Sequence, residues 1–216
     1  AVSYGVPTLG IFYNADMLNQ AGITSPPQNW QELVDASSKI TKKSGSNLTQ
    51  SGVALGTASV ANASSIMPLL MIQNGATMTN NPPTEAIFQK PASDNYPSSA
   101  KAVDFYTSFA KPGKSTYSWS DGFGESTQAF AGGKTAMIID YPYKYLSLKA
   151  QSPKLNFKMA KAPQLNANSP INYTEYWAEA VSKSSKYREI AWDFYYFMTT
   201  YDLSLIHISE PTRRRG

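Results

Sequence analysis

The sequence predicts an α/β fold, because segments with strand-like and helix-like patterns alternate along most of its 216 residues. Two observations carry this prediction. Short apolar runs such as residues 135–140 are bounded by glycine or turn residues, which is typical of buried strands. Longer segments such as residues 187–201 place their apolar side chains on one helical stripe. The chain shows no internal repeat.

The first half of the chain predicts two strands and four helices. The strands are expected at residues 10–14 and 52–56, and the helices at residues 16–21, 29–45, 59–73 and 98–111. Asn29 is a favourable N-cap for the second helix, with Glu32 three positions later. Pro68 is expected to kink the third helix or to move its start. Residues 77–97, which are polar and contain four prolines, are expected to form a surface excursion.

The second half continues the alternation with shorter elements. After a loop at residues 117–124 we expect, in order, a helix at 125–131, a strand at 135–140, a helix at 141–150, a strand at 155–162, a polar linker at 163–172, a strand at 176–182 and a helix at 187–201.

The amino-acid composition argues against most kinds of catalytic site. The chain has no cysteine and one histidine, which excludes a disulfide framework, a cysteine-based zinc site and a thiol nucleophile. One histidine also removes most triads and multi-histidine metal sites. The longest apolar run, residues 66–72, is interrupted by Pro68 and is too short to span a bilayer. We therefore expect that the chain is not an enzyme and that it binds no metal ion and no cofactor.

The charge does not indicate a nucleic-acid partner. The formal net charge is +4, but Glu210 and three arginines at the C-terminal end contribute two of these units. The other lysines are scattered and form no stripe that could follow a phosphate backbone.

The C-terminal residues 203–216 differ from everything before them. They contain His207, the only histidine, and three of the four arginines. The string LIHISEPTRR resembles translated sequencing-adapter read-through, so we expect a non-native tail and assign His207 no role. The other end begins without Met and without a charged segment before an apolar one, which predicts either a removed leader or a start further upstream.

Enzyme motifs are absent from the sequence. It has no phosphate-binding glycine loop, no HExxH and no GxSxG. The Gly pair before Lys134 is better explained as a helix C-cap. Glu175 and Glu179 lie four apart in a strand-like region, so a carboxylate pair for glycoside hydrolysis stays open.

Aromatic residues gather where the chain is expected to turn. Any one of them has packing as its more common role, but the set favours a binding site for flat ligands or sugar faces, with nearby polar side chains taking the hydroxyls. These residues are Tyr4, Trp119, Tyr141, Tyr143, Tyr173, Tyr176 and Trp177.

Four sequence blocks together resemble the extracellular solute-binding proteins of ABC importers, family 1, the carbohydrate-type group. The first runs from YGVPTLGIFYNADMLNQAGI to PPQNWQELVDASSKIT; the others are MIQNGA, STQAFAGGKTAMIIDYPY and YWAEAVSKSSKYREIAWDFYYFMTT. They occur in the order seen in that family and cover about residues 1–202.

The resemblance implies a periplasmic-binding-protein-like (type II) fold of two α/β lobes, of which this chain holds mostly one. It implies that residues 1–162 form the second, C-terminal-type ligand-binding lobe, residues 163–172 a crossover linker and residues 173–202 a return segment of the first lobe. Complete members are about twice as long, so roughly the first hundred residues and a C-terminal stretch are expected to be missing. A hinge between the lobes closes over the ligand in this family.

The resemblance also implies a ligand-binding set. By position in the motifs, this set is Tyr4, Asn62, Trp119, Tyr141, Tyr143, Tyr176 and Trp177. No residue is expected to be catalytic, and none to bind a metal.

The function implied is the substrate-binding component of an ABC importer, which captures a sugar, an oligosaccharide or a related polyol between its lobes. Its partners would be the permease transmembrane subunits, and the complete protein would be a monomer outside the cytoplasmic membrane, periplasmic or lipid-anchored. The alternatives that stay open are a carbohydrate-active hydrolase using an Asp/Glu pair and a sensory receptor domain of the same fold.

Overall fold

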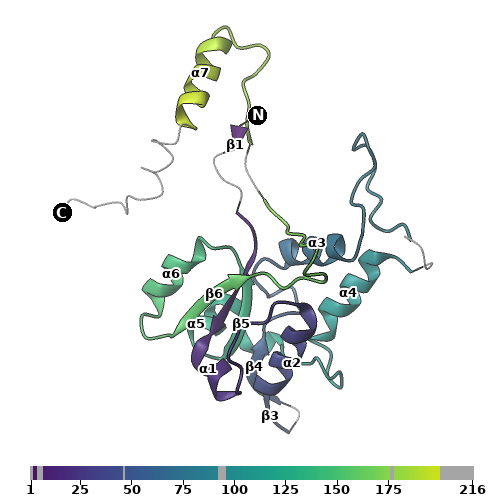
Figure 1. The fold of residues 1–216 in the computed structure, drawn as a ribbon, viewed down its shortest axis with the longest axis vertical. Coiled ribbons are helices and arrows are strands. Elements are labelled where there is room, and N and C mark those ends of the chain that lie inside the picture. The colour runs from purple at the N-terminus through teal and green to yellow at the C-terminus, as the bar shows by residue number, and fades with distance from the viewer. Residues whose placement is uncertain (1, 4–6, 46, 92–95, 176–177, 200–216) are drawn as a thin grey trace, which may run out of the picture. The chain divides into compact units, whose positions relative to one another are not determined.

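The computed structural model describes residues 2–3, 7–45, 47–91, 96–175 and 178–199 (Figure 1). The chain forms two compact units. The larger comprises Thr8–Thr174, and the smaller is made of the segments on either side of it. Within the described residues, no helix is long and apolar enough to cross a membrane.

A five-stranded mixed sheet is the centre of the larger unit. Its order is β3-β4-β5-β2-β6, with β2 at Gly10–Asn14, β3 at Lys42–Ser44, β4 at Asn47–Val53, β5 at Thr135–Asp140 and β6 at Phe157–Lys161. Strands β4 and β5 are parallel, whereas β2 is antiparallel to both β5 and β6. Gly10 pairs with Asp140 and with Lys161. The C-terminal ends of β5 and β6 therefore meet the start of β2 at one edge of the sheet.

Helices pack around this sheet (Figure 1). Helix α2 packs on β4, α5 packs on β5, and α3 lies against α4. The bounds are α1 at Ala15–Gln20, α2 at Trp30–Ile40, α3 at Ala63–Gln73, α4 at Ser98–Ser108, α5 at Ser126–Ala131 and α6 at Lys144–Gln151, with a 3₁₀ turn η1 at Asp121–Phe123.

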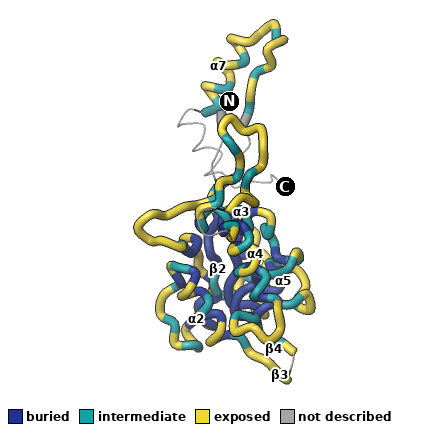
Figure 2. The backbone as a smooth tube through the Cα atoms, turned by 90° about the vertical axis from the view of Figure 1, so that its right-hand side faces the viewer, coloured by how far each residue is buried: buried dark blue, intermediate teal, exposed yellow. Residues whose placement is uncertain are grey.

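Burial is concentrated in the central strands, which Figure 2 shows in dark blue. Every residue of β5 is buried, and only its two end residues, Thr135 and Asp140, are polar. The rings of Phe12 and Phe130 both pack on Phe157, with centroids 6.2 and 5.8 Å away. A second aromatic cluster has Phe105 edge-on to Trp30 and to Phe109. The sheet therefore provides a rigid base for the loops at its edges.

Residues 163–172, predicted as a linker, pack onto the larger unit. The buried side chain of Gln73 donates to the carbonyls of Pro163 and Ile171, at 3.2 and 2.9 Å. The same side chain accepts from the Trp30 indole at 2.6 Å. The segment is thus tied to α3 and to the start of α2, and its role as a crossover between lobes stays a prediction.

The structure differs from the predicted elements at residues 41–62. Helix α2 ends at Ile40 rather than near Gly45, and β3 and β4 form a hairpin that the sequence did not predict. Gly45 has φ +61°, which suits a tight turn and cannot continue a helix. Helix α3 begins at Ala63 rather than Ser59 and keeps Pro68 inside it. Asn62 has φ 56°, so the helix cannot extend backwards through it.

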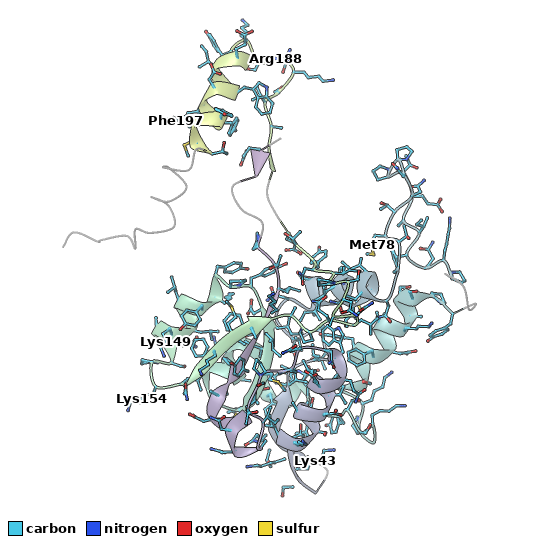
Figure 3. The ribbon with its side chains drawn as sticks, in the orientation of Figure 1. Lys43, Met78, Lys149, Lys154, Arg188 and Phe197 are labelled. Atoms are coloured by element: carbon cyan, nitrogen blue, oxygen red, sulfur yellow. The ribbon has the colours of Figure 1, made fainter. Side chains whose placement is uncertain are left out.

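The described part of the smaller unit contains a two-stranded pairing and one helix. Strand β1 (Val2–Ser3) pairs antiparallel with β7 (Ala178–Glu179). Helix α7 spans Arg188–Met198 and has no buried residue. Figure 3 shows the side chains that project from it, with Arg188 and Phe197 labelled. The predicted tail, residues 203–216, lies outside the described residues.

Candidate functional site

Two strand ends and a helix start meet at one edge of the larger unit. Strand β5 ends at Asp140, and α3 begins directly after Asn62. The Asn62 amide nitrogen donates to the Asp140 carboxylate at 2.7 Å, which joins the two elements across 78 positions of sequence. Strand β4, parallel to β5, leads towards the same edge through residues 54–62. We call this region the β5–α3 edge; it contains Thr57, Ser59, Asn62, Asp121, Asp140, Tyr141 and Tyr143.

Asp140 is completely buried at this edge. One carboxylate oxygen accepts from both Asn62 and the Tyr141 backbone N–H, each at 2.7 Å. The other oxygen is buried and has no hydrogen-bond partner in the described part of the chain. Burial raises the pKa of Asp140, while the hydrogen bonds from Tyr141 and Asn62 act in the opposite direction.

Two stacked tyrosine rings follow β5. The rings of Tyr141 and Tyr143 lie 5.6 Å apart with an interplanar angle of 10°. Tyr141 is 3% exposed, whereas Tyr143 is 62% exposed. The buried ring thus fixes the plane of the exposed one, which leaves Tyr143 as a flat, oriented surface at the edge.

Trp119 lies beneath this edge rather than on its surface. The side chain is fully buried and stacks on Phe123, with ring centroids 5.2 Å apart. Its indole N–H donates to the Thr57 hydroxyl at 3.1 Å. In this conformation Trp119 supports residues 57–59 and offers no exposed ring for stacking.

Hydrogen-bonded side chains connect Trp119 to the surface. The Ser59 hydroxyl donates to Asp121 at 2.7 Å and lies 2.7 Å from the Thr57 hydroxyl. Because a carboxylate only accepts, the Ser59 hydroxyl is the donor in its bond to Asp121. Hydrogen bonds from the Ser59 and Thr57 hydroxyls lower the pKa of the exposed Asp121 carboxyl. These hydrogen bonds therefore end on a carboxyl group at the edge.

The structure brings together three of the seven residues expected to bind ligand. Asn62, Tyr141 and Tyr143 meet at the β5–α3 edge. Trp119 is connected to this edge by the hydrogen bond from its indole N–H to the Thr57 hydroxyl. The remaining three, Tyr4, Tyr176 and Trp177, lie outside the described residues.

Sequence reasoning did not single out Asp140 or Asp121. The signal for Asp140 was present, because it is the one charged residue at the end of an otherwise apolar strand. Asp121 carried no such signal, since an aspartate beside glycine in a loop is ordinary turn chemistry.

The residues at this edge suit a neutral polar ligand better than a metal. Among the described residues, no group of three or more His, Asp or Glu side chains could hold a metal ion. A surface cavity of about 450 Å³ lies between residues 22–28 and α2, and none of its lining residues was expected to bind ligand. An aromatic face beside amide and carboxylate groups is a combination that contacts sugar rings and hydroxyls.

Comparison with known proteins identifies the family. Residues 1–212 match the family model described as bacterial extracellular solute-binding protein. The chain belongs to this family. A curated binding protein of Brucella abortus (strain 2308) is 25% identical over 199 residues, which are 88% of this chain and 45% of that protein. This solute-binding chain therefore spans about half the length of the curated relatives it matches.

Solved structures show the same fold at low identity. The cyclic alpha-maltosyl-1,6-maltose binding protein of Arthrobacter globiformis matches with a TM-score of 0.70 and 20% identity, over 94% of this chain and 49% of that one. An ABC transporter solute-binding protein of Thermotoga lettingae, bound to alpha-D-tagatose, matches with a TM-score of 0.63 and 21% identity, over 96% and 51%. The predicted two-lobe fold with mostly one lobe present is thus confirmed.

Proposed function

We propose that this chain is the ligand-binding part of an ABC importer's substrate-binding component, and that it captures a sugar, an oligosaccharide or a related polyol. The observation that carries the proposal is the Tyr141–Tyr143 stack, whose outer ring is 62% exposed at the end of β5. Support comes from relatives of the same fold whose structures contain alpha-D-tagatose, mannotriose and D-mannitol.

Capture would combine stacking with hydrogen bonds to hydroxyls. The exposed Tyr143 ring packs on the apolar C–H face of a sugar, and the buried Tyr141 ring holds its plane before the ligand arrives. In this proposal Asn62 and Asp121 would bond the hydroxyls of the sugar. A ligand without matching hydroxyls would leave these groups unpaired, which is the source of specificity.

The location and partners that we propose for the complete protein are those of the solute-binding family. The complete protein would act outside the cytoplasmic membrane, close its two lobes around the ligand and deliver it to permease transmembrane subunits. Tyr4, Tyr176 and Trp177 lie outside the described residues, and their role as ligand-binding residues stays a prediction from sequence. Catalysis is not part of the proposal.

The proposal is tested by titrating the full chain with alpha-D-tagatose, D-mannitol, maltose and mannotriose while following tryptophan fluorescence. We expect saturable binding of at least one of them, and about tenfold weaker binding of that ligand after Tyr143→Ala, because the stacking face is lost. Saturable binding that Tyr143→Ala leaves unchanged would place the site elsewhere.

Tyr117 provides a matched control for Tyr143. Its ring lies under the Lys43 ammonium group, 5.1 Å from it, beside the β3–β4 hairpin. Figures 1 and 2 both place this hairpin at the opposite end of the larger unit from α3. Tyr117→Ala should therefore leave sugar affinity unchanged.

A further inference from the structure

The start of α3 does not use its N-cap side chain in the usual way. Asn is among the preferred N-cap residues because its side chain accepts from the first amides of the helix. Asn62 makes no such bond, and its side chain donates to Asp140 instead. It is also the one non-glycine residue with positive φ in the described part of the chain. The local conformation is therefore less favourable than an ordinary helix start, and the contact with Asp140 accompanies that deviation.

The Asp140 carboxylate is unusual in a second way. It is completely buried, and one of its oxygens has no hydrogen-bond partner among the described residues. An unpaired buried carboxylate oxygen is costly, and packing would be served equally well by an apolar residue at the end of β5. The oxygen that is used holds the Asn62 side chain and the Tyr141 backbone together.

We propose that Asp140 is a positioning residue for ligand recognition: it fixes the Asn62 amide so that its carbonyl oxygen faces a ligand hydroxyl. This rests on the function proposed above and adds a residue to it.

The chemistry follows from the donor and acceptor inventory of an amide. A side-chain amide has one carbonyl oxygen and two N–H groups, and its two ends are similar in shape. Because one N–H of Asn62 donates to Asp140, the amide cannot flip, and the carbonyl is held away from that carboxylate. In the described residues this carbonyl has no protein partner, so it stays available as an acceptor. The second N–H is a donor beside it. A pair of neighbouring hydroxyls on a sugar or polyol matches that arrangement.

A double-mutant cycle on the full chain tests this inference, with mannotriose and D-mannitol as the probes. Asn62→Gly removes the amide and tolerates the positive φ, and Asp140→Ala removes the acceptor. Each substitution should weaken binding about tenfold, the equivalent of one positioned hydrogen bond. Asp140→Ala also releases the Tyr141 backbone N–H, so the double variant should bind no more weakly than Asp140→Ala alone if Asn62 depends on Asp140. A further tenfold loss in the double variant relative to Asp140→Ala would overturn the inference.

Asp140→Asn is the conservative variant and also guards against misfolding. It keeps one acceptor oxygen at this position, so it should keep Asn62 in place and hold affinity within about threefold of the wild type. If Asp140→Ala does not fold, the ligand affinities of Asp140→Asn and Asn62→Gly are compared instead to test the positioning role. Binding as weak in Asp140→Asn as in Asn62→Gly would contradict a positioning role.

A measurement without ligand separates this inference from the proposed function. In ¹⁵N NMR spectra, the Asn62 side-chain NH₂ pair should be shifted from free-amide values in the wild type and in Asp140→Asn. It should move towards those values in Asp140→Ala. An unchanged pair in Asp140→Ala overturns the positioning role. If no sugar or polyol binds the wild type, the proposed function fails, and with it the recognition role assigned to Asp140, whatever the NH₂ pair shows.

Discussion

At the scale of single residues, Asp140 should make stability depend on pH. Burial is the largest cause of its raised pKa, and Glu125 adds to the effect, while the Tyr141 amide, Asn62 and Lys144 oppose it. The ordinary value is 3.8, so over a window above pH 4 the folded chain holds a proton that the unfolded chain has lost. In that window folding stability falls as pH rises, because the unfolded state binds fewer protons.

Asp140→Asn removes this dependence. Relative to the wild type, the variant should gain free energy of unfolding as the pH rises from about 4 towards 7. Urea unfolding of both proteins across this range measures the difference. A difference that stays constant with pH would show that Asp140 titrates as an ordinary surface carboxylate does.

Gly52 is required by the close approach of α2 to β4. A Cβ atom at this position would lie 2.3 Å from the Ser37 backbone oxygen and 2.6 Å from the Ser37 Cα. Gly52→Ala should therefore lower the free energy of unfolding by about 2 kcal/mol, because backbone atoms must move apart. Thermal unfolding measures this. Gly122→Ala, where the nearest atom is a Ser120 side-chain oxygen at 3.5 Å, should change stability little. Equal stability of the two variants would count against the packing described.

At the scale of elements, α2 has the N-terminus that its sequence predicts. The Asn29 side chain accepts from the Glu32 backbone N–H at 2.8 Å, and the Glu32 carboxylate reaches back to the Gln28 N–H at 2.7 Å. Asn29→Ala should cost about 1 kcal/mol of stability, since it leaves that amide without its cap. Gln31→Ala on the exposed face of the same helix is the matched comparison and should cost less than about 0.5 kcal/mol. Chemical denaturation distinguishes them, and an equal cost would contradict the capping role.

Elements with a strong local pattern were predicted well from sequence. The strands β2 and β5 have the predicted bounds, because an apolar run bounded by turn residues leaves few alternatives. The β3–β4 hairpin was missed because the lysines and polar residues around Gly45 have no clear period. Its pairing depends on the contact of β4 with β5, some 80 residues further along, which no local pattern records.

The site was predictable only in part, for the same reason. Tyr143 was found because an aromatic residue directly after a buried strand is a visible pattern. The burial of Trp119 and the contact of Asp140 with Asn62 depend on residues 62 and 78 positions away. A single sequence contains the residues of such contacts but not their pairing.

At the scale of the whole molecule, α7 leaves a large apolar surface exposed. Ile190, Phe194 and Phe197 are 67%, 56% and 58% exposed. Contiguous apolar surface of this kind promotes association in water. The chain alone should therefore bind the dye ANS and self-associate in size-exclusion chromatography. Replacing Ile190 and Phe194, which share a helical face, by lysine should reduce both effects. A monomeric sample of residues 1–202 that melts cooperatively and binds no dye would contradict this expectation.

The central claim is that a sugar binds at the β5–α3 edge through Tyr143. Its most direct test is isothermal calorimetry of the full chain with mannotriose, D-mannitol and alpha-D-tagatose, in the wild type, in Tyr143→Ala and in Tyr117→Ala. The account predicts measurable heat of binding for at least one of these ligands, the same affinity in Tyr117→Ala and about tenfold weaker affinity in Tyr143→Ala. Equal affinity in all three proteins would contradict the account. So would a wild type that binds none of the three ligands.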